Sequence, residues 1–264
     1  MVHQKTGGII MFVLRLLTSL YDESLVWYCM SSHRWKFDLQ KIEMKEMSGD
    51  VVQHMTEQMS RLPSKTQMGL KLCSCLGPNF DAVVLEKARK GANIGDKFLE
   101  SCVDDGFLQA KRDSSYTWAH DQVQQAAYEL IPLHQREKFH LLIGSRLFLC
   151  TSPSEMETFI FYIVDNINRG ANLVDNAEQK YEVAELNLRA GEIVLERQSF
   201  HSSVKYLMTG IALLENDSWE KKYSLTIRLY DAGRSLFLCL CSFVSFKLVY
   251  SNLTVIQLLK LYVL

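Results

Sequence analysis

Apolar residues recur every three or four positions along most of this chain, which is the spacing of a helix with one buried face. Segments with this spacing lie at 9–20, 51–62, 68–76, 81–90, 94–105, 135–150, 156–167, 178–197 and 201–214. Alternation of apolar and polar residues, typical of a strand, is short and is found at 25–29, 35–39 and 116–119. The pattern therefore predicts a mainly α protein with small β-hairpins.

The stretch Tyr116–Pro132 combines both patterns. Trp118 lies in the alternating part, and Asp121 is expected to cap the helix that follows, with Gln124 as its reciprocal partner. Pro132 cannot continue that helix. The apolar face of the helix is predicted to consist of Val123, Ala126, Ala127, Leu130 and Ile131. The stretch therefore predicts a strand that leads directly into a helix.

A histidine beside a carboxylate, as in His120-Asp121, suggests general base chemistry. Adjacent residues at a strand–helix junction point in different directions, however, and no nucleophile lies at a useful spacing. We therefore interpret the stretch as structural rather than catalytic. The residues assigned to this structural motif are Trp118, His120, Asp121, Gln124 and Tyr128.

Other helix signals punctuate the first half of the chain. Ser48 and Ser64 are expected to cap the helices that follow them, with Gln67 as the reciprocal partner of Ser64. Gly77-Pro78 is a strong stop signal. Three helices followed by a hairpin of 107–110 and 116–119 give the element order of a winged helix.

The charge of the third of these helices bears on DNA binding. This helix carries four acidic residues and one basic residue, Lys97, so its net charge is −3. The acidic residues are Asp96, Glu100, Asp104 and Asp105. Affinity for DNA depends on lysine and arginine contacts to phosphate. We therefore expect a protein-contacting or purely structural winged helix, and keep a DNA-binding regulator as an alternative.

Composition and short motifs do not indicate a further function. The chain has 264 residues, a net charge of −1 and seven cysteines without a closed framework, which favours reduced thiols and a cytoplasmic location. The phosphate-loop pattern does not occur, and His134 and His140 lack the spacing of a helical metal pair. We therefore assign no catalytic, cofactor-binding or metal-binding residue to this chain.

The end of the chain is unusually apolar. Lys247 and Lys260 are its only charges after Leu236, and the stretch is long enough to span a bilayer. A lysine within a span is costly. A buried terminal segment is therefore the preferred interpretation, and a membrane-anchored helical scaffold stays open as an alternative.

The second half of the chain has the spacing of paired helices. Small residues at Ala190, Gly191, Ser203 and Gly210 lie close to the positions that small residues take in tetratricopeptide repeats. Such residues let two helices approach closely. The spacing indicates helical hairpins, although it covers little more than one repeat.

Together these features resemble the region that follows the nucleotide-binding core in STAND-type AAA ATPases, as found in multi-sensor histidine kinases and serine/threonine kinases. The resemblance rests on the order of four motifs: residues 116–128, His140, Asn168-Arg169-Gly170 and residues 186–191. Upstream it extends through Lys5-Thr6-Gly7-Gly8, where Ile9 and Ile10 replace the family's Asn and Pro.

The resemblance implies a division of the chain into four parts. These are lid helices with a hairpin at 1–62, a winged helix at 63–132, tetratricopeptide-like helices at 133–236 and an apolar tail at 237–264. It also implies that ATP and magnesium bind only in a complete parent protein. The expected partners are proteins or other domains of that parent rather than nucleic acid, and membrane contact is expected only through the tail.

Overall fold

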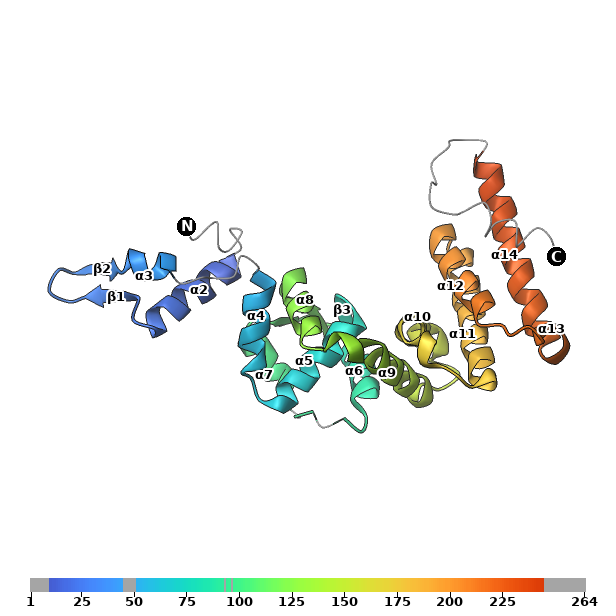
Figure 1. The fold of residues 1–264 in the computed structure, drawn as a ribbon, viewed down its shortest axis with the longest axis horizontal. Helices are drawn as coiled ribbons and strands as arrows, with labels where there is room; N and C mark the ends of the chain where they lie inside the picture. Colours follow the sequence, from blue (N-terminus) through green and yellow to red (C-terminus); the bar gives the residue numbers. More distant parts are fainter. Residues whose placement is uncertain (1–9, 45–50, 93, 96, 245–264) are drawn as a thin grey trace. The chain divides into compact units, whose positions relative to one another are not determined.

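The computed structural model describes residues 10–44, 51–92, 94–95, 97–244. The chain is mainly helical, with two small antiparallel sheets (Figure 1). The predicted fold class is therefore confirmed. The chain divides into two compact units, Met1–Leu133 and His134–Leu264, which are described separately below.

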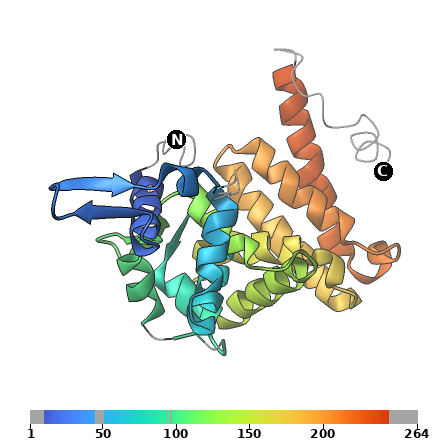
Figure 2. The ribbon, with the colours of Figure 1, turned by 60° about the vertical axis from the view of Figure 1, so that its left-hand side comes forward.

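The first unit begins with a helix and a β-hairpin. These are α2 (Ile10–Asp22), β1 (Val26–Cys29), β2 (Arg34–Phe37) and the short α3 (Leu39–Met44) (Figure 2). The strands are antiparallel, with Val26 opposite Phe37 and Tyr28 opposite Trp35, so the predicted hairpin is confirmed. Its apolar cluster is small and consists of Leu16, Leu20 and Ile42. The predicted turn at Thr6–Gly8 lies outside the described residues.

Helices and a second sheet form the rest of the first unit. In order, they are α4 (Val51–Ser60), α5 (Ser64–Leu76), β3 (Asn79–Asp81), α6 (Ala82–Arg89), α7 (Phe98–Asp104), β4 (Leu108–Ala110), β5 (Ser115–Trp118) and α8 (Asp121–Glu129). The sheet has the antiparallel order β3-β5-β4. Strand β3 was not predicted, because three residues are too few to show alternation. Helix α8 packs on α4 and α5, so α4 contacts the segment beyond the predicted boundary at 62/63.

The start of α5 differs from the prediction. Its N-cap residue is Pro63, and no side chain caps it. Gln67 instead donates from Nε2 to the carbonyl oxygens of Ser60 and Leu62, each at 2.8 Å. The amide of Gln67 therefore closes the turn between α4 and α5, which leaves the predicted capping box with Ser64 unformed. Ser48 lies outside the described residues.

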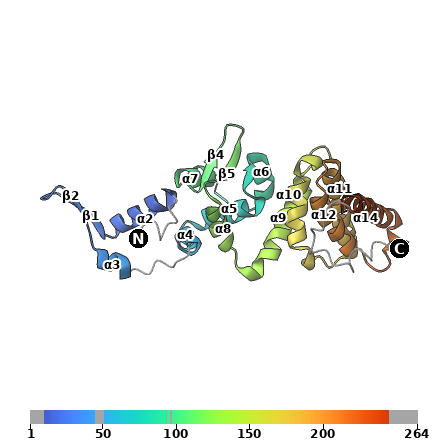
Figure 3. The same ribbon diagram turned by 90° about the horizontal axis from the view of Figure 1, so that it is seen from above.

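The second unit consists of packed helices. They are α9 (Arg136–Cys150), α10 (Met156–Arg169), α11 (Ala177–Glu196), α12 (Phe200–Ala212), α13 (Ser218–Lys221) and α14 (Tyr223–Val244), with short 3-10 turns η1 (Leu133–Gln135) and η2 (Ala171–Leu173). Helix α9 packs on α10, and α11 packs on α12 (Figure 3). Helix α14 packs on both α11 and α12. The paired helices predicted for this half are therefore present.

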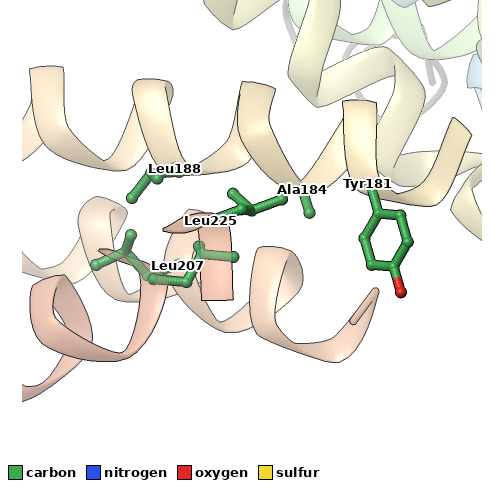
Figure 4. Close-up of a cluster of buried hydrophobic side chains, with 6 residues drawn as sticks. Tyr181, Ala184, Leu188, Leu207 and Leu225 are labelled. Atoms are coloured by element: carbon green, nitrogen blue, oxygen red, sulfur yellow. The ribbon is translucent and has the colours of Figure 1, made fainter. Parts of the chain in front are cut away.

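Buried apolar side chains hold the second unit together. One cluster joins three helices and consists of Tyr181, Ala184, Leu188, Leu207, Leu225 and Leu229 (Figure 4). A Cβ atom added at Gly191 would lie 2.8 Å from Leu207 Cδ2, so α11 and α12 approach closely at this glycine. The small residues at Gly191 and Ser203 thus have a packing role.

Helices long and apolar enough to cross a bilayer are absent from the described residues. Helix α14 is described as far as Val244, and the rest of the predicted apolar tail, 245–264, lies outside the described residues.

Candidate functional site

The predicted structural motif attaches β5 and α8 to the carboxyl end of α5. Trp118 is 6% exposed, and its indole Nε1 donates to the carbonyl oxygen of Gly77 at 3.1 Å. Its backbone N–H donates to Pro78 O at 3.3 Å. Gln124 Nε2 donates to Ser74 O at 3.2 Å. Because the last carbonyl groups of a helix lack partners within it, these bonds cap α5 from a distant part of the sequence.

The amino end of α8 differs from the prediction by one residue. His120 is the N-cap, with an extended backbone (φ −158°, ψ 154°), and Asp121 is already helical. The N–H of Gln122 lies 2.9 Å from Asp121 Oδ1 and 3.2 Å from His120 Nδ1. Asp121 therefore lies within the first turn of α8, where its carboxylate stabilises the helix, and it is not the N-cap residue. Gln124 does not complete a capping box, since its amide binds α5.

The motif residues do not converge on one chemical site. Trp118 and Gln124 meet at the end of α5, whereas His120 and Asp121 contact each other at the start of α8. Tyr128 is half-buried near the other end of α8, where its carbonyl oxygen accepts the N–H of Ile131 at 3.0 Å. The arrangement aligns secondary-structure elements and offers no nucleophile with a base beside it.

A second polar cluster lies within the apolar contact of α9 and α10. His140 is 1% exposed, and its Nδ1 lies 2.8 Å from Asn166 Oδ1. Arg169 Nη1 lies 3.4 Å from His140 Nε2. Arginine can only donate, so Nε2 accepts and the ring proton is on Nδ1, where it is donated to Asn166. Asn166 Nδ2 in turn donates to Tyr162 O at 2.8 Å, which fixes the orientation of the amide.

A reciprocal amide pair joins α10 to α11. Asn168 Nδ2 donates to Asn187 Oδ1 at 2.8 Å, and Asn187 Nδ2 donates to Asn168 Oδ1 at 2.9 Å. Asn187 is fully buried and also donates to Val183 O. A buried amide left without partners costs free energy, so this pair favours one relative position of the two helices.

Sequence reasoning missed the bonds of these two clusters. Asn166 lies between Ile163 and Ile167, within the buried stripe of α10. A polar residue inside an apolar stripe was the available signal. Its partner on α9, His140, was not apparent because it is 26 residues away in sequence.

The His140 cluster predicts a dependence of stability on pH. Burial, followed by the positive charges of Arg169 and Arg136, lowers the pKa of His140 below 6.5. At pH values between that lowered pKa and about 6.5, the unfolded chain takes up a proton that the folded chain does not. The free energy of unfolding therefore decreases as the pH is lowered through this range. We expect the urea concentration at the midpoint of unfolding to decrease as the pH is lowered from about 7.5 to 5.5. The stability that is lost should be that of the second unit.

The control for this prediction is His140→Gln, which keeps a polar side chain but cannot take up a proton. All other groups are the same in the two proteins, so the difference between the two curves reports His140. Parallel curves over this range would contradict the assignment.

Other reactive groups in the described structure do not form a catalytic arrangement. Burial raises the pKa of Cys73 and raises that of Cys102 to about 12, which makes both thiols unreactive. Hydrogen bonds from the Ser31 and Ser32 hydroxyls lower the pKa of Cys29 to about 6. Groups of three metal-binding side chains are absent among the described residues.

A shallow cavity of about 390 Å³ is lined by Glu215, Asn216 and Asp217. Its carboxylates already bind the protein itself. Glu215 pairs with Lys180 at 3.1 Å, and Asp217 pairs with Lys221 at 2.6 Å. The cavity therefore offers no unpaired charge to a ligand.

Comparison with known proteins adds one distant relative. The chain is similar to the hybrid signal transduction histidine kinase G of Dictyostelium discoideum, with 23% identity over 297 aligned residues. The alignment covers 87% of this chain and 8% of that protein, so the chain spans a small part of the relative's length. No family model matches the chain, and no solved structure matches it. The similarity is thus to one part of a signalling protein.

Proposed function

We propose that this chain is a non-catalytic part of a STAND-type AAA ATPase signalling protein, in which it couples the nucleotide state of another part to partner binding. One observation carries the proposal. The residues that carry the resemblance to this class are those that connect neighbouring elements. Trp118 and Gln124 bond to the carboxyl end of α5, His140 contacts Arg169, and Asn168 pairs with Asn187. Such residues transmit position between elements rather than perform chemistry.

The first unit supplies the relay in this proposal. The order α5-β3-α6-α7-β4-β5, with β3 and β4 on either side of β5, supports a winged helix. Helix α8 is bonded to the end of α5 by Gln124 and to α4 by Thr56, whose Oγ1 donates to Ala126 O at 3.3 Å. A displacement of α4 or α5 would therefore displace α8.

The second unit supplies the partner-binding surface. Its antiparallel helix pairs, closely packed at Gly144 and Gly191, support tetratricopeptide-like repeats. A Cβ atom at Gly144 would lie 2.6 Å from Ile167 Cγ1, so larger residues cannot be accommodated there without a shift. Stacked helix pairs of this kind present extended surfaces to protein partners.

DNA binding is the weaker proposal for the first unit. Exposed Glu100, Asp104 and Asp105 lie on or beside α7, the helix that would approach DNA. Phosphate groups would be repelled by these carboxylates. A salt-dependent shift of duplex DNA by the purified chain would favour this alternative.

The proposal predicts a longer reading frame and a coupled response. The native transcript upstream of Met1 is expected to encode a phosphate loop in frame. In the longer product, ATP should change amide hydrogen exchange in α5 and α8, whereas the present chain alone should not hydrolyse ATP. Gln124→Ala should weaken the response in α8, because it removes the bond to Ser74 O.

The matched control is Gln125→Ala, since Gln125 is exposed on the same helix and its amide Nε2 donates to Glu129 of that helix at 3.2 Å. It should leave the response intact. A stop codon in frame directly upstream would overturn the proposal. So would ATP turnover by the chain alone, or an ATP-bound longer product without a change in α5 and α8.

A further inference from the structure

Two glycines bring α9 and α10 close together on either side of His140. A Cβ atom added at Gly144 would lie 2.6 Å from Ile167 Cγ1. One added at Gly170 would lie 2.5 Å from the carbonyl oxygen of Glu137. His140 lies between these two contacts along α9 and is 1% exposed. Because packed interiors leave little free volume, the ring of His140 cannot turn away unless the helices separate.

Both ring nitrogens of neutral His140 contact α10, but their partners differ in freedom. The N–H at Nδ1 donates to Asn166 Oδ1 at 2.8 Å, and Nε2 accepts from Arg169 Nη1 at 3.4 Å. Asn166 is 3% exposed and is held by its own bond to Tyr162 O. Arg169 is the last residue of α10 and is exposed. Of these two partners, the arginine can therefore move into solvent without opening a cavity.

The charged groups that act on the His140 ring are both positive. Burial, followed by the charges of Arg169 on α10 and Arg136 on α9, lowers the pKa of His140 below 6.5. The acidic residues of the two helices are directed elsewhere, since Asp165 of α10 bonds to α12 and Glu137 of α9 is exposed. The turn η2, which also packs on α9, carries no charged residue. A proton taken up by His140 therefore meets positive charge.

Protonation changes one of the two ring contacts and keeps the other. The proton binds to the electron pair of Nε2 that accepts the N–H of Arg169. Two N–H groups and two positive charges then face each other, and they repel. The bond from Nδ1 to Asn166 becomes charge-assisted, which strengthens it. The arginine contact is therefore the one that breaks.

We propose that His140 is a proton switch that releases the side chain of Arg169 from the contact between α9 and α10, while the two helices stay packed. In the neutral state, the guanidinium lies against the buried ring. In the protonated state, it turns into solvent at the carboxyl end of α10. The change is local to the second unit, precedes unfolding, and does not depend on a nucleotide-binding part of a longer protein.

Nuclear magnetic resonance of the full chain tests this proposal. The ring signals of His140 and the Nε–H signal of Arg169 should shift together as the pH is lowered from about 7.5 to 5. Their common midpoint should lie at the lowered pKa of His140, below 6.5. Backbone amides in α9 and α10 should keep their protection from hydrogen exchange below that midpoint. In His140→Gln, the Arg169 signal should not shift.

Arg169→Gln provides a second test, because it removes the positive charge that faces Nε2. The titration midpoint of His140 should rise by roughly half a pH unit or more. The matched control is Arg189→Gln, which removes an arginine that pairs with Glu157 at 3.4 Å and should leave this midpoint unchanged.

Three results would contradict the switch. The first is an Arg169 signal that does not follow the titration of His140, and the second is an unchanged midpoint in Arg169→Gln. The third is a loss of amide protection throughout α9 and α10 at the same midpoint, because the helices would then separate instead of releasing one side chain.

Discussion

Trp118→Ala is expected to destabilise the first unit by about 3–5 kcal/mol, the usual cost of truncating a buried tryptophan. The ring of Trp118 is 6% exposed, so its loss leaves a cavity beside β4 and α5. Its N–H also satisfies the carbonyl of Gly77 at the end of α5. Stabilities of whole domains are about 5–15 kcal/mol, so this loss is a large fraction of the total.

Hydrogen exchange measured by mass spectrometry can assign this loss to one unit. Protection should fall in peptides from α5, β5 and α8 and should be unchanged in those from α11 and α12. Trp118→Phe is the matched control, because it keeps an aromatic ring while it removes the bond to Gly77 O and leaves a smaller cavity. It should therefore cost less than Trp118→Ala. Equal, small effects of the two substitutions would contradict the packing role of Trp118.

Leu207→Ala is expected to destabilise the second unit by about 2–5 kcal/mol. Leu207 is 1% exposed in the cluster that joins α11, α12 and α14 (Figure 4). Gly191 lies directly against its side chain, and closing the resulting cavity would require a shift of the helices. The range of the estimate reflects how far the helices can move inward.

The readout is again hydrogen exchange, with protection lost in α11, α12 and α14 and retained in α5 and α8. Leu149→Ala serves as the control, since the leucine removed is 81% exposed and surface changes usually shift stability by less than about 0.5 kcal/mol. Similar losses from the two leucine substitutions would show that Leu207 does not hold the helices together.

Patterns of nearest neighbours in sequence predicted much of this structure. Helical spacing identified the buried face of α10 and that of α8, where Val123, Ala126 and Ala127 are fully buried. Alternation identified the hairpin of β1 and β2. The division into four parts and the assignment of no catalytic, cofactor-binding or metal-binding residue stay predictions.

Positions that depend on distant residues were predicted poorly. The spacing of Gln67 and Gln124 allowed a local capping box, yet both amides bind carbonyl groups at other helix ends. The start of α7 was placed at Ile94 and lies at Phe98. For the two glutamines, a local rule was overridden by a bond that exists only once the elements have packed.

The sequence by itself determined that the chain is mainly helical, where most helices lie, and that Tyr116–Pro132 passes from strand to helix. These properties follow from the period of apolar residues and from local backbone preferences. Only the tertiary structure decided that Trp118 and Gln124 cap α5, that His120 begins α8, and that Asn168 pairs with Asn187. Buried polar groups must find partners wherever packing places them, and a pattern of near neighbours does not contain that information.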